Sequence, residues 1–270
     1  MSRLDTAYYD LGRLDLLAGK DTIIHRLDPR VKVITTLLFI ICVVSFDKYE
    51  VSRLLPFFIF PALLVGIADL PLNYLLRKLI LVSPFVLFIG IFNPFLDREI
   101  LLHIGSLQVS GGWLSLISIL LRFILTVGAG LLLIATTGFP AICMAIEKLG
   151  APKIFAVLLL MLYRYLFVLI EESIRMMRAY TLRAFSKKKP RYTIFKQLLG
   201  NLLLRTLDRA QRIHLAMLSR AFTGDIKIAR QFSFGTNEYL YLAGCAALFT
   251  VVRFIDISKL LGKLLMETGL

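Results

Sequence analysis

The amino-acid sequence predicts an all-α, polytopic membrane protein with about five transmembrane helices and long amphipathic helices on the cytoplasmic side. Hydrophobic residues make up 58% of its 270 positions, whereas a soluble domain has about 45–50% apolar residues. The mean hydropathy is +0.77, and the apolar residues form runs long enough to span a bilayer. The net charge is +14, and the charged residues lie beside these apolar runs. This position favours anionic lipid or an acidic protein over nucleic acid as the partner.

Four transmembrane spans are predicted in the first half of the chain. Asp28 can cap a helix and Pro29 fits its first turn, so the first apolar run follows them directly. A loop is expected at 97–112, between the third and fourth runs. The four runs cover residues 31–46, 54–70, 79–96 and 113–139.

The basic residues predict the orientation of the chain in the membrane. Residues 171–236 contain 14 Lys and Arg and 4 Asp and Glu, a net charge of +10, and the positive-inside rule places such a segment in the cytoplasm. Arg26, Arg30 and Lys32 place the N-terminal flank on the same side. An even number of spans therefore separates the two segments.

This parity decides the expected position of residues 153–186. Four spans already precede them, and a fifth crossing at 153–170 would put the basic segment outside the cell. We therefore expect 153–186 to form one long helix along or obliquely through the inner interface, and 238–254 to form the last span. If the N-terminus lies outside instead, 153–170 becomes an ordinary span.

Three segments follow from this topology. Residues 1–139 hold the N-terminal segment and four spans, residues 140–236 form a helical module on the cytoplasmic side, and residues 237–270 hold the last span and the C-terminal tail.

A short string occurs twice in the basic segment, as LRAFS at 182–186 and SRAFT at 219–223. Each copy is expected at the C-terminal end of a long helix, where an arginine suits the helix dipole. Planar guanidinium groups also favour carboxylate pairing. From the residues alone, protein docking and contact with lipid headgroups both remain open. The positions concerned are Leu182, Arg183, Ala184, Ser219, Arg220 and Ala221.

A supporting basic face is predicted on the same two helices. On the second helix, which is expected at 193–222, arginines recur every three or four residues and form one stripe beside a mostly apolar stripe. On the first helix, Glu171 and Arg175 are spaced for a favourable i, i+4 pair. The members of this basic face are Arg175, Arg178, Arg205, Arg209 and Arg212.

No motif for catalysis, for a metal or for a cofactor is found. Gly19 and Lys20 lack the glycine that a Walker A motif needs five positions earlier, because Leu14 stands there, so ATP hydrolysis by this chain is not expected. The three histidines lie far apart in the sequence, which argues against a metal site; they are His25, His103 and His214.

Arg122 is a separate question, because it lies inside the fourth apolar run. An arginine within a membrane span is by default a candidate for function. The alternative, which we favour, is that Arg122 snorkels to an interface or pairs with a loop.

Four stretches together resemble the transmembrane T component of energy-coupling-factor (ECF) transporters, the EcfT/CbiQ family, and within it the cobalt-import subunits. The resemblance covers nearly the whole chain in order. The stretches are HRLDPRVKV at 25–33, FNPF at 92–95, YRYLFVLIEESIRMMRAYTLRAF at 163–185 and AMLSRAF at 216–222.

The resemblance implies a coupling role for the two arginine strings. In the family, two cytoplasmic coupling helices each end in a short motif, typically Ala-Arg-Gly, that docks in a groove of an ABC ATPase. The matching positions here are Leu182-Arg183-Ala184 and Ser219-Arg220-Ala221. The arginine is kept in both, while both flanks differ from the family's pattern.

The resemblance also implies the partners. These are a pair of ABC ATPase subunits, which hold ATP and Mg²⁺, and a substrate-binding (S) membrane subunit on the apolar helix faces, within a prokaryotic inner (cytoplasmic) membrane. The chain itself is then a non-catalytic subunit without a cofactor, and cobalt or nickel is the implied cargo.

Two other classes of function are weighed against this reading. A stand-alone secondary transporter predicts inverted repeats and ionisable residues within the spans; apart from Arg122, neither is found. A membrane enzyme acting on lipids predicts clustered polar residues at the interface, where this chain offers arginines but few acids.

Overall fold

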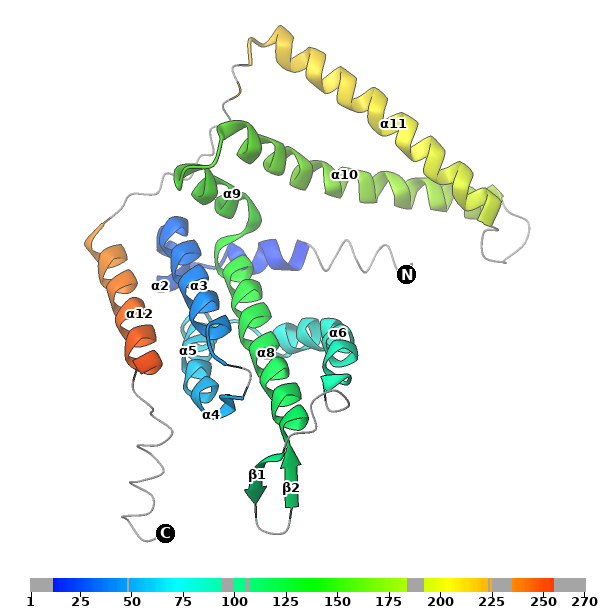
Figure 1. Cartoon of the computed structure of the whole chain (residues 1–270). Helices are drawn as coiled ribbons and strands as arrows, with labels where there is room; N and C mark the ends of the chain where they lie inside the picture. The colour runs from blue at the N-terminus through cyan, green and yellow to red at the C-terminus, as the bar shows by residue number, and fades with distance from the viewer. Residues whose placement is uncertain are drawn as a thin grey trace. The chain divides into compact units, whose positions relative to one another are not determined.

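The computed structural model describes residues 12–47, 49–93, 100–104, 107–183, 192–222, 224 and 235–254, and gives the main chain alone for 100–104 and 107–110. Figure 1 shows a chain built almost wholly of helices, with one short hairpin. The fold is therefore that of an all-α polytopic membrane protein, as the sequence predicts.

The chain divides into two compact units. The core unit is Leu17–Gly138 with Phe232–Leu270, and the arm unit is Phe139–Gln231 with Met1–Leu16. The helices of the core unit are α2 (Ile23–Arg26), α3 (Pro29–Val44), α4 (Val51–Leu54), η1 (Leu55–Phe58), α5 (Ile59–Ile67), α6 (Leu72–Gly90), α8 (Gly111–Thr137) and α12 (Thr236–Phe254). Those of the arm unit are α9 (Phe139–Lys148), α10 (Lys153–Arg183) and α11 (Tyr192–Ser219).

The first helix of the core begins where the sequence predicts. The Asp28 carboxylate accepts a hydrogen bond from the Arg30 N–H at 2.8 Å, and Pro29 occupies the first turn of α3. A side-chain acceptor at this position satisfies one of the free N–H groups of a helix start. α3 and α12 begin two residues before the predicted starts of the first and last spans. Both segments are therefore helical, and their crossing of the membrane stays a prediction.

The second predicted span is divided into α4, η1 and α5. Pro56 lies in the 3₁₀ segment η1, because a proline lacks the N–H that an α-helix would use at that point. The three pieces still follow one another without a loop, from Val51 to Ile67.

The third predicted span is shifted along the chain. α6 begins at Leu72, directly after Pro71, and ends at Gly90, whereas the sequence predicts 79–96. Arg77 and Lys78 therefore lie within the first turns of α6 and not before it. No breaker separates them from Pro71, and long basic side chains at a helix end can reach an interface.

The stretch expected to be a loop contains a two-stranded antiparallel hairpin. β1 (Ile100–Ile104) pairs with β2 (Leu107–Ser110), with Ile104 opposite Leu107. The isoleucine, leucine and valine residues of this stretch have a high propensity for strands. The expectation of an irregular loop is corrected here.

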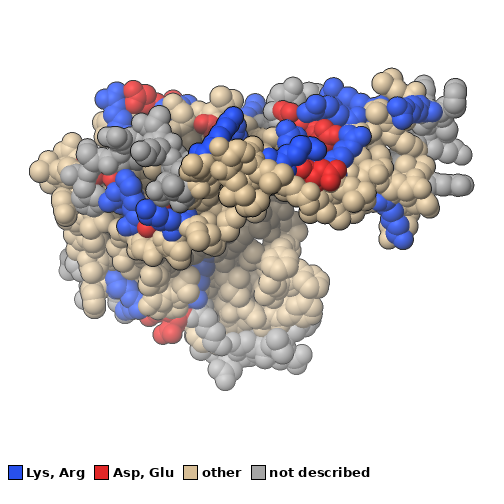
Figure 2. Space-filling view, turned by 90° about the horizontal axis from the view of Figure 1, so that it is seen from above, with Lys and Arg blue, Asp and Glu red and all other residues tan. Residues whose placement is uncertain are grey.

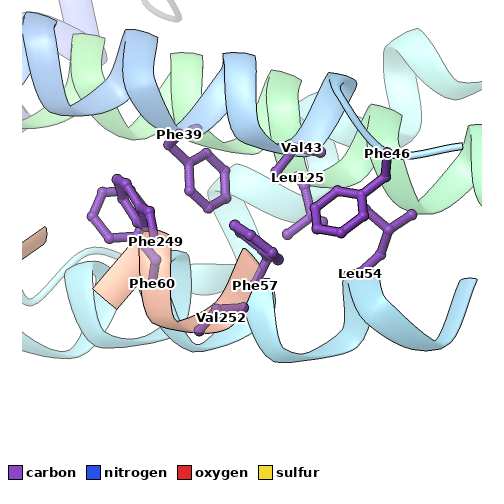
Figure 3. Packing of buried hydrophobic residues seen from close by; sticks show 10 residues of the cluster. Phe39, Val43, Phe46, Leu54, Phe57, Phe60, Leu125, Phe249 and Val252 are labelled. Carbon is purple, nitrogen blue, oxygen red and sulfur yellow. The ribbon is translucent and has the colours of Figure 1, made fainter. Parts of the chain in front are cut away.

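An aromatic core holds the core unit together (Figure 3). The Phe39 ring of α3 lies with its centroid 4.8 Å from that of Phe60 and 5.4 Å from that of Phe249, which are favourable separations for ring pairs. The core joins α3, α4, η1, α5, α8 and α12 across distant parts of the sequence. Its buried members are Phe39, Val43, Phe46, Leu54, Phe57, Phe60, Leu125, Ala129, Phe249 and Val252.

The arm unit has almost no buried core of its own. In α10 only Ala156 is buried, and in α11 no residue is buried. The two helices lie antiparallel, and Figure 1 shows the end of α10 beside the start of α11. Helices with such exposed faces are surfaces for a membrane or for partners.

Among the described residues, three helices are long and apolar enough to cross a membrane by length and composition alone: α6, α8 and α10. The chain is accordingly a multi-pass membrane protein. α10 is the helix that the sequence reading places at the inner interface, and its position there stays a prediction.

Candidate functional site

The two long helices of the arm unit form a hairpin with an open groove. Arg205 of α11 reaches across to the Glu172 carboxylate of α10. Nearer the closed end, apolar side chains surround a hollow of about 230 Å³: Ser173, Met176, Met177, Phe195, Leu198, Leu199 and Leu202.

The open end of the hairpin carries a larger groove of about 600 Å³. Its α10 wall is mostly apolar, with Leu158, Met161 and Val168 among its residues, while its α11 wall includes Arg209 and Arg212. The groove thus offers apolar contact on one side and cationic contact on the other.

The members of the predicted basic face lie on both helices of the hairpin, and Arg178 is exposed on α10. Arg175 pairs with Glu171 at 3.4 Å, as its spacing predicts, and lies 3.8 Å from Glu172. Figure 2 shows basic and acidic atoms side by side over this hairpin. Arg175 and Arg205 are therefore ion-paired. Arg205 also lines the groove, together with Arg209 and Arg212.

The second arginine string closes α11 with a specific turn. The Phe222 N–H donates to the Met217 carbonyl at 3.1 Å, and the Ala221 N–H donates to the Leu218 carbonyl at 3.0 Å. This is the Schellman pattern, in which the residue after the helix cap adopts the left-handed conformation. Ala221 has a φ of 51°, and Arg220 is the cap residue just before it.

The same turn ends α9, with a glycine in the matching place. The Ala151 N–H donates to the Ile146 carbonyl at 3.2 Å, and the Gly150 N–H donates to the Glu147 carbonyl at 3.0 Å. Gly150 has a φ of 117°. Glycine adopts this conformation without the steric penalty that a Cβ brings. The alanine at 221 is therefore strained, and the position is one that a glycine would suit.

The first arginine string lies at the end of α10. Leu182 is 88% exposed, and Arg183 is exposed as the last residue of the helix. Ala184 lies outside the described residues. Within the part of the chain that the structure describes, neither Arg183 nor Arg220 has an ion-pair partner.

The two strings lie at opposite ends of α11. Because α11 has 28 residues, its length is about 42 Å. The hairpin therefore presents, at well-separated tips, two arginines that have no ion-pair partner among the described residues. Ser219 and Arg220 are exposed at one of these tips.

A buried polar cluster in the core unit was missed by the sequence reading, which treats Lys32 as a flanking charge. Lys32 is only 4% exposed. Its ammonium donates to the His25 carbonyl at 3.3 Å and to the Thr136 carbonyl at 3.1 Å. The stretch that carries this cluster, HRLDPRVK, predicts a helix start and a basic flank, and it resembles a family, but it does not predict a buried site. A lysine three residues inside a helix gives no sign that it is buried.

Arg122 pairs with a loop. Its guanidinium donates to the Asp47 carbonyl at 2.6 Å. Arg253 of α12 acts similarly nearby, donating to the Ser45 carbonyl at 3.2 Å and lying 4.1 Å from the Phe46 ring centroid. Both arginines thus hold the chain just after α3.

Among the described residues, no group of three or more His, Cys, Asp or Glu side chains could hold a metal ion. His25 belongs to the core unit and His214 to the arm unit, and the His103 side chain lies outside the described atoms.

Known proteins of one kind resemble the chain. The energy-coupling factor transporter transmembrane protein EcfT of Bacillus subtilis is 28% identical over 75% of this chain and 82% of its own length. The EcfT protein of Leuconostoc gelidum is 30% identical over 74% of this chain and 79% of its own length. A putative fused cobalt transport protein CbiMQ of Methanocorpusculum labreanum is 31% identical over 33% of this chain and 15% of its own length.

The match to a protein family covers more of the chain than any of these three relatives. Residues 20–231 match CbiQ, the cobalt transport protein family, and this range contains both arginine strings and the buried Lys32 cluster. The chain therefore belongs to the CbiQ family, and it is a T component, the membrane subunit, of an ECF transporter.

Proposed function

We propose that this chain is the coupling subunit of an ECF-type importer, in which Arg183 and Arg220 each dock one of two ABC ATPase subunits. ATP and Mg²⁺ are held by those partners, and the chain itself hydrolyses nothing. Closure of the ATPase pair moves the two helix tips. The helices pass this motion to a separate S subunit, which carries the substrate across the cell membrane of a prokaryote.

The observation that carries the proposal is the matched pair of tips. Both arginines are exposed at helix ends and lack a carboxylate partner among the described residues. An unpaired guanidinium is well suited to bidentate pairing in an acidic groove. The separation along α11, about 42 Å, fits two ATPase subunits better than one small ligand.

The apolar faces supply the second surface that the function needs. Leu203 and Leu207 of α11 are 59% and 53% exposed. They belong to the apolar stripe beside the arginines, and a membrane subunit resting on this stripe would remove it from lipid and water. We propose that the S subunit lies there.

Cobalt is the proposed cargo, and nickel is the alternative. The support is the name of the matching family and of the fused CbiMQ relative. The metal would be bound by the S subunit and would be a substrate of the transporter, not a cofactor of this chain.

The test reverses both tip charges. We expect Arg183→Glu with Arg220→Glu to abolish co-purification of the ATPase pair and to stop Co²⁺ uptake, because each guanidinium would be replaced by a charge that its acidic groove repels. Membrane insertion should be unchanged. Co-purification is measured by affinity capture, and uptake by accumulation of radioactive cobalt.

The matched control reverses the same charge on the same hairpin. Arg209→Glu with Arg212→Glu alters the groove wall of α11 and leaves both tips intact, so the ATPases should still co-purify. If the tip variant keeps its ATPases, or if both variants lose them equally, docking does not depend on the two strings.

A further inference from the structure

The buried cluster around Lys32 lies where the chain passes between its two units. The continuous part of the core unit begins at Leu17 and ends at Gly138. On the arm side, Leu16 precedes the first of these residues and Phe139 follows the last. These are the two passages between the units that fall within the described residues.

Lys32 stabilises the end of α8, just before the chain passes from Gly138 to Phe139. Thr136 is the penultimate residue of α8, so its carbonyl is among the last four of the helix, which have no partner within it. The Lys32 ammonium supplies that partner at 3.1 Å, and its charge suits the negative end of the helix dipole.

The same ammonium is tied to the first passage through His25. Lys32 donates to the His25 carbonyl at 3.3 Å, and the His25 ring hydrogen-bonds the Thr22 hydroxyl at 2.7 Å. The main chain at Leu17 and at Ala135 lies close enough to the ring to act on the pKa of His25. One cluster therefore links both ends of the segment from Leu17 to Gly138.

The cluster is built as an interior site. His25, Asp28 and Lys32 are 2%, 1% and 4% exposed. Burying an ammonium is expensive unless it is fully hydrogen-bonded, so the contacts of Lys32 resist separation. Asp28 caps α3 beside it.

A glycine follows the cluster directly at the end of α8. A single residue, Gly138, joins α8 to α9, and its φ is 79°. Glycine adopts this conformation without strain. A firmly held helix end is thus followed at once by a joint of one residue.

We propose that Lys32 is a positioning residue for energy coupling: it clamps the core-unit side of both passages, so that motion of the arm unit bends the chain at Gly138 instead of fraying α8. This rests on the proposed function, because that function supplies the motion. Without Lys32, the end of α8 and the segment near Leu17 would lose their hydrogen bonds when the arm unit moves. The motion would then distort these ends and would not reach the rest of the core unit.

The first test measures the clamp in the isolated chain by amide hydrogen exchange. We expect Lys32→Met to speed exchange about tenfold or more, because a charge-assisted bond is lost, at residues 17–27 and 132–138 together. Acceleration at 132–138 alone would make Lys32 an ordinary helix cap and would overturn the proposal.

The matched control is Arg122→Met. It also removes a cationic bond to a main-chain carbonyl in the core unit, but it lies 14 residues before Thr136 on the same helix, about 20 Å away. It should speed exchange near Asp47 and leave both passages unchanged.

The second test measures coupling in the reconstituted complex with its ATPases and S subunit. Lys32→Met should keep ATPase co-purification and hydrolysis, while Co²⁺ transported per ATP falls about fivefold; Lys32→Arg should recover part of the loss, and Arg122→Met should keep the wild-type ratio. Equal losses in Lys32→Met and Arg122→Met would overturn the proposal.

The proposal can still be tested if Lys32→Met fails to insert into the membrane or if the wild-type chain fails to bind the ATPases. If Lys32→Met does not insert, Gly138→Ala strains the joint without touching the buried charge, and an unchanged transport ratio would then count against the proposal. If wild-type chain fails to bind the ATPases, the proposed function fails, and the exchange experiment still decides whether Lys32 clamps both passages.

Discussion

Single side chains in this protein act mainly by what they do to helix ends. Asp28 caps the start of α3, Lys32 completes the end of α8, and Arg220 caps α11. The sequence predicts the first of these, because Asp-Pro is a local signal. It does not predict the second, since the Thr136 carbonyl lies 104 residues away from Lys32 and only the tertiary fold brings them together.

His25 makes stability depend on pH. Burial, and then the neighbouring Lys32 ammonium, lower the pKa of His25 below its ordinary value of 6.5. The unfolded chain therefore binds a proton below pH 6.5 that the folded chain does not yet bind, and stability falls as the pH falls, by up to about 1.4 kcal/mol per pH unit.

Unfolding of the purified chain between pH 8 and pH 5 measures this effect. His25→Gln should flatten the dependence, whereas His214→Gln, on the exposed face of α11, should leave it as in the wild type. A dependence that is unchanged by His25→Gln would assign it to other groups.

The observed helices match their predicted ranges closely where hydrophobic periodicity and the length of the apolar run define them. The match is poorer where a proline or a high strand propensity changes the local structure. α8, α10, α11 and α12 lie within a few residues of their predicted ranges. The start of α6 differs from the prediction because Arg77 and Lys78 lie within the helix, which begins directly after Pro71. The hairpin β1–β2 was missed because its segment is short.

α9 and α11 end in the same type of turn, with a glycine in one and an alanine in the other. Exchanging these two residue types should therefore change the stability of the two helix ends in opposite directions. Ala221→Gly should stabilise the end of α11 by about 1 kcal/mol, because it removes the left-handed penalty of a Cβ. Gly150→Ala should destabilise the end of α9 by a similar amount of about 1 kcal/mol, since no neighbouring atom lies within 4 Å of the added Cβ and only the backbone conformation matters.

Local amide exchange at each turn measures both changes. Slower exchange at 217–222 in Ala221→Gly, with faster exchange at 145–151 in Gly150→Ala, is the expected pattern. If both substitutions shift exchange in the same direction, the left-handed conformation is not what limits these turns.

At the scale of the whole molecule, charge and hydropathy predict the class of protein, and the resemblance of four stretches indicates the family. α10 is apolar and long enough to cross a bilayer, yet the parity of basic segments predicts that it lies along the inner interface. Hydropathy alone does not separate these cases, because an interfacial helix packed under a partner and a spanning helix share the same apolar composition.

Cysteine labelling settles the topology. In a variant without the native cysteines, Lys188→Cys should react with a membrane-impermeant maleimide only in inside-out vesicles, because 171–236 is expected in the cytoplasm. Reaction in intact cells would make α10 a transmembrane helix. Asp47→Cys, at the opposite end of α3 from Lys32, supplies the control that labels from the outside.

The near absence of burial in α10 and α11 also bears on the life of the protein before assembly. A hairpin without a core gains its hydrophobic stabilisation only when other chains cover it. A newly made copy that meets no ATPase or S subunit would display the same exposed leucines that chaperones and membrane proteases recognise. The abundance of this subunit should then be set by the supply of its partners, so that surplus copies are degraded instead of accumulating.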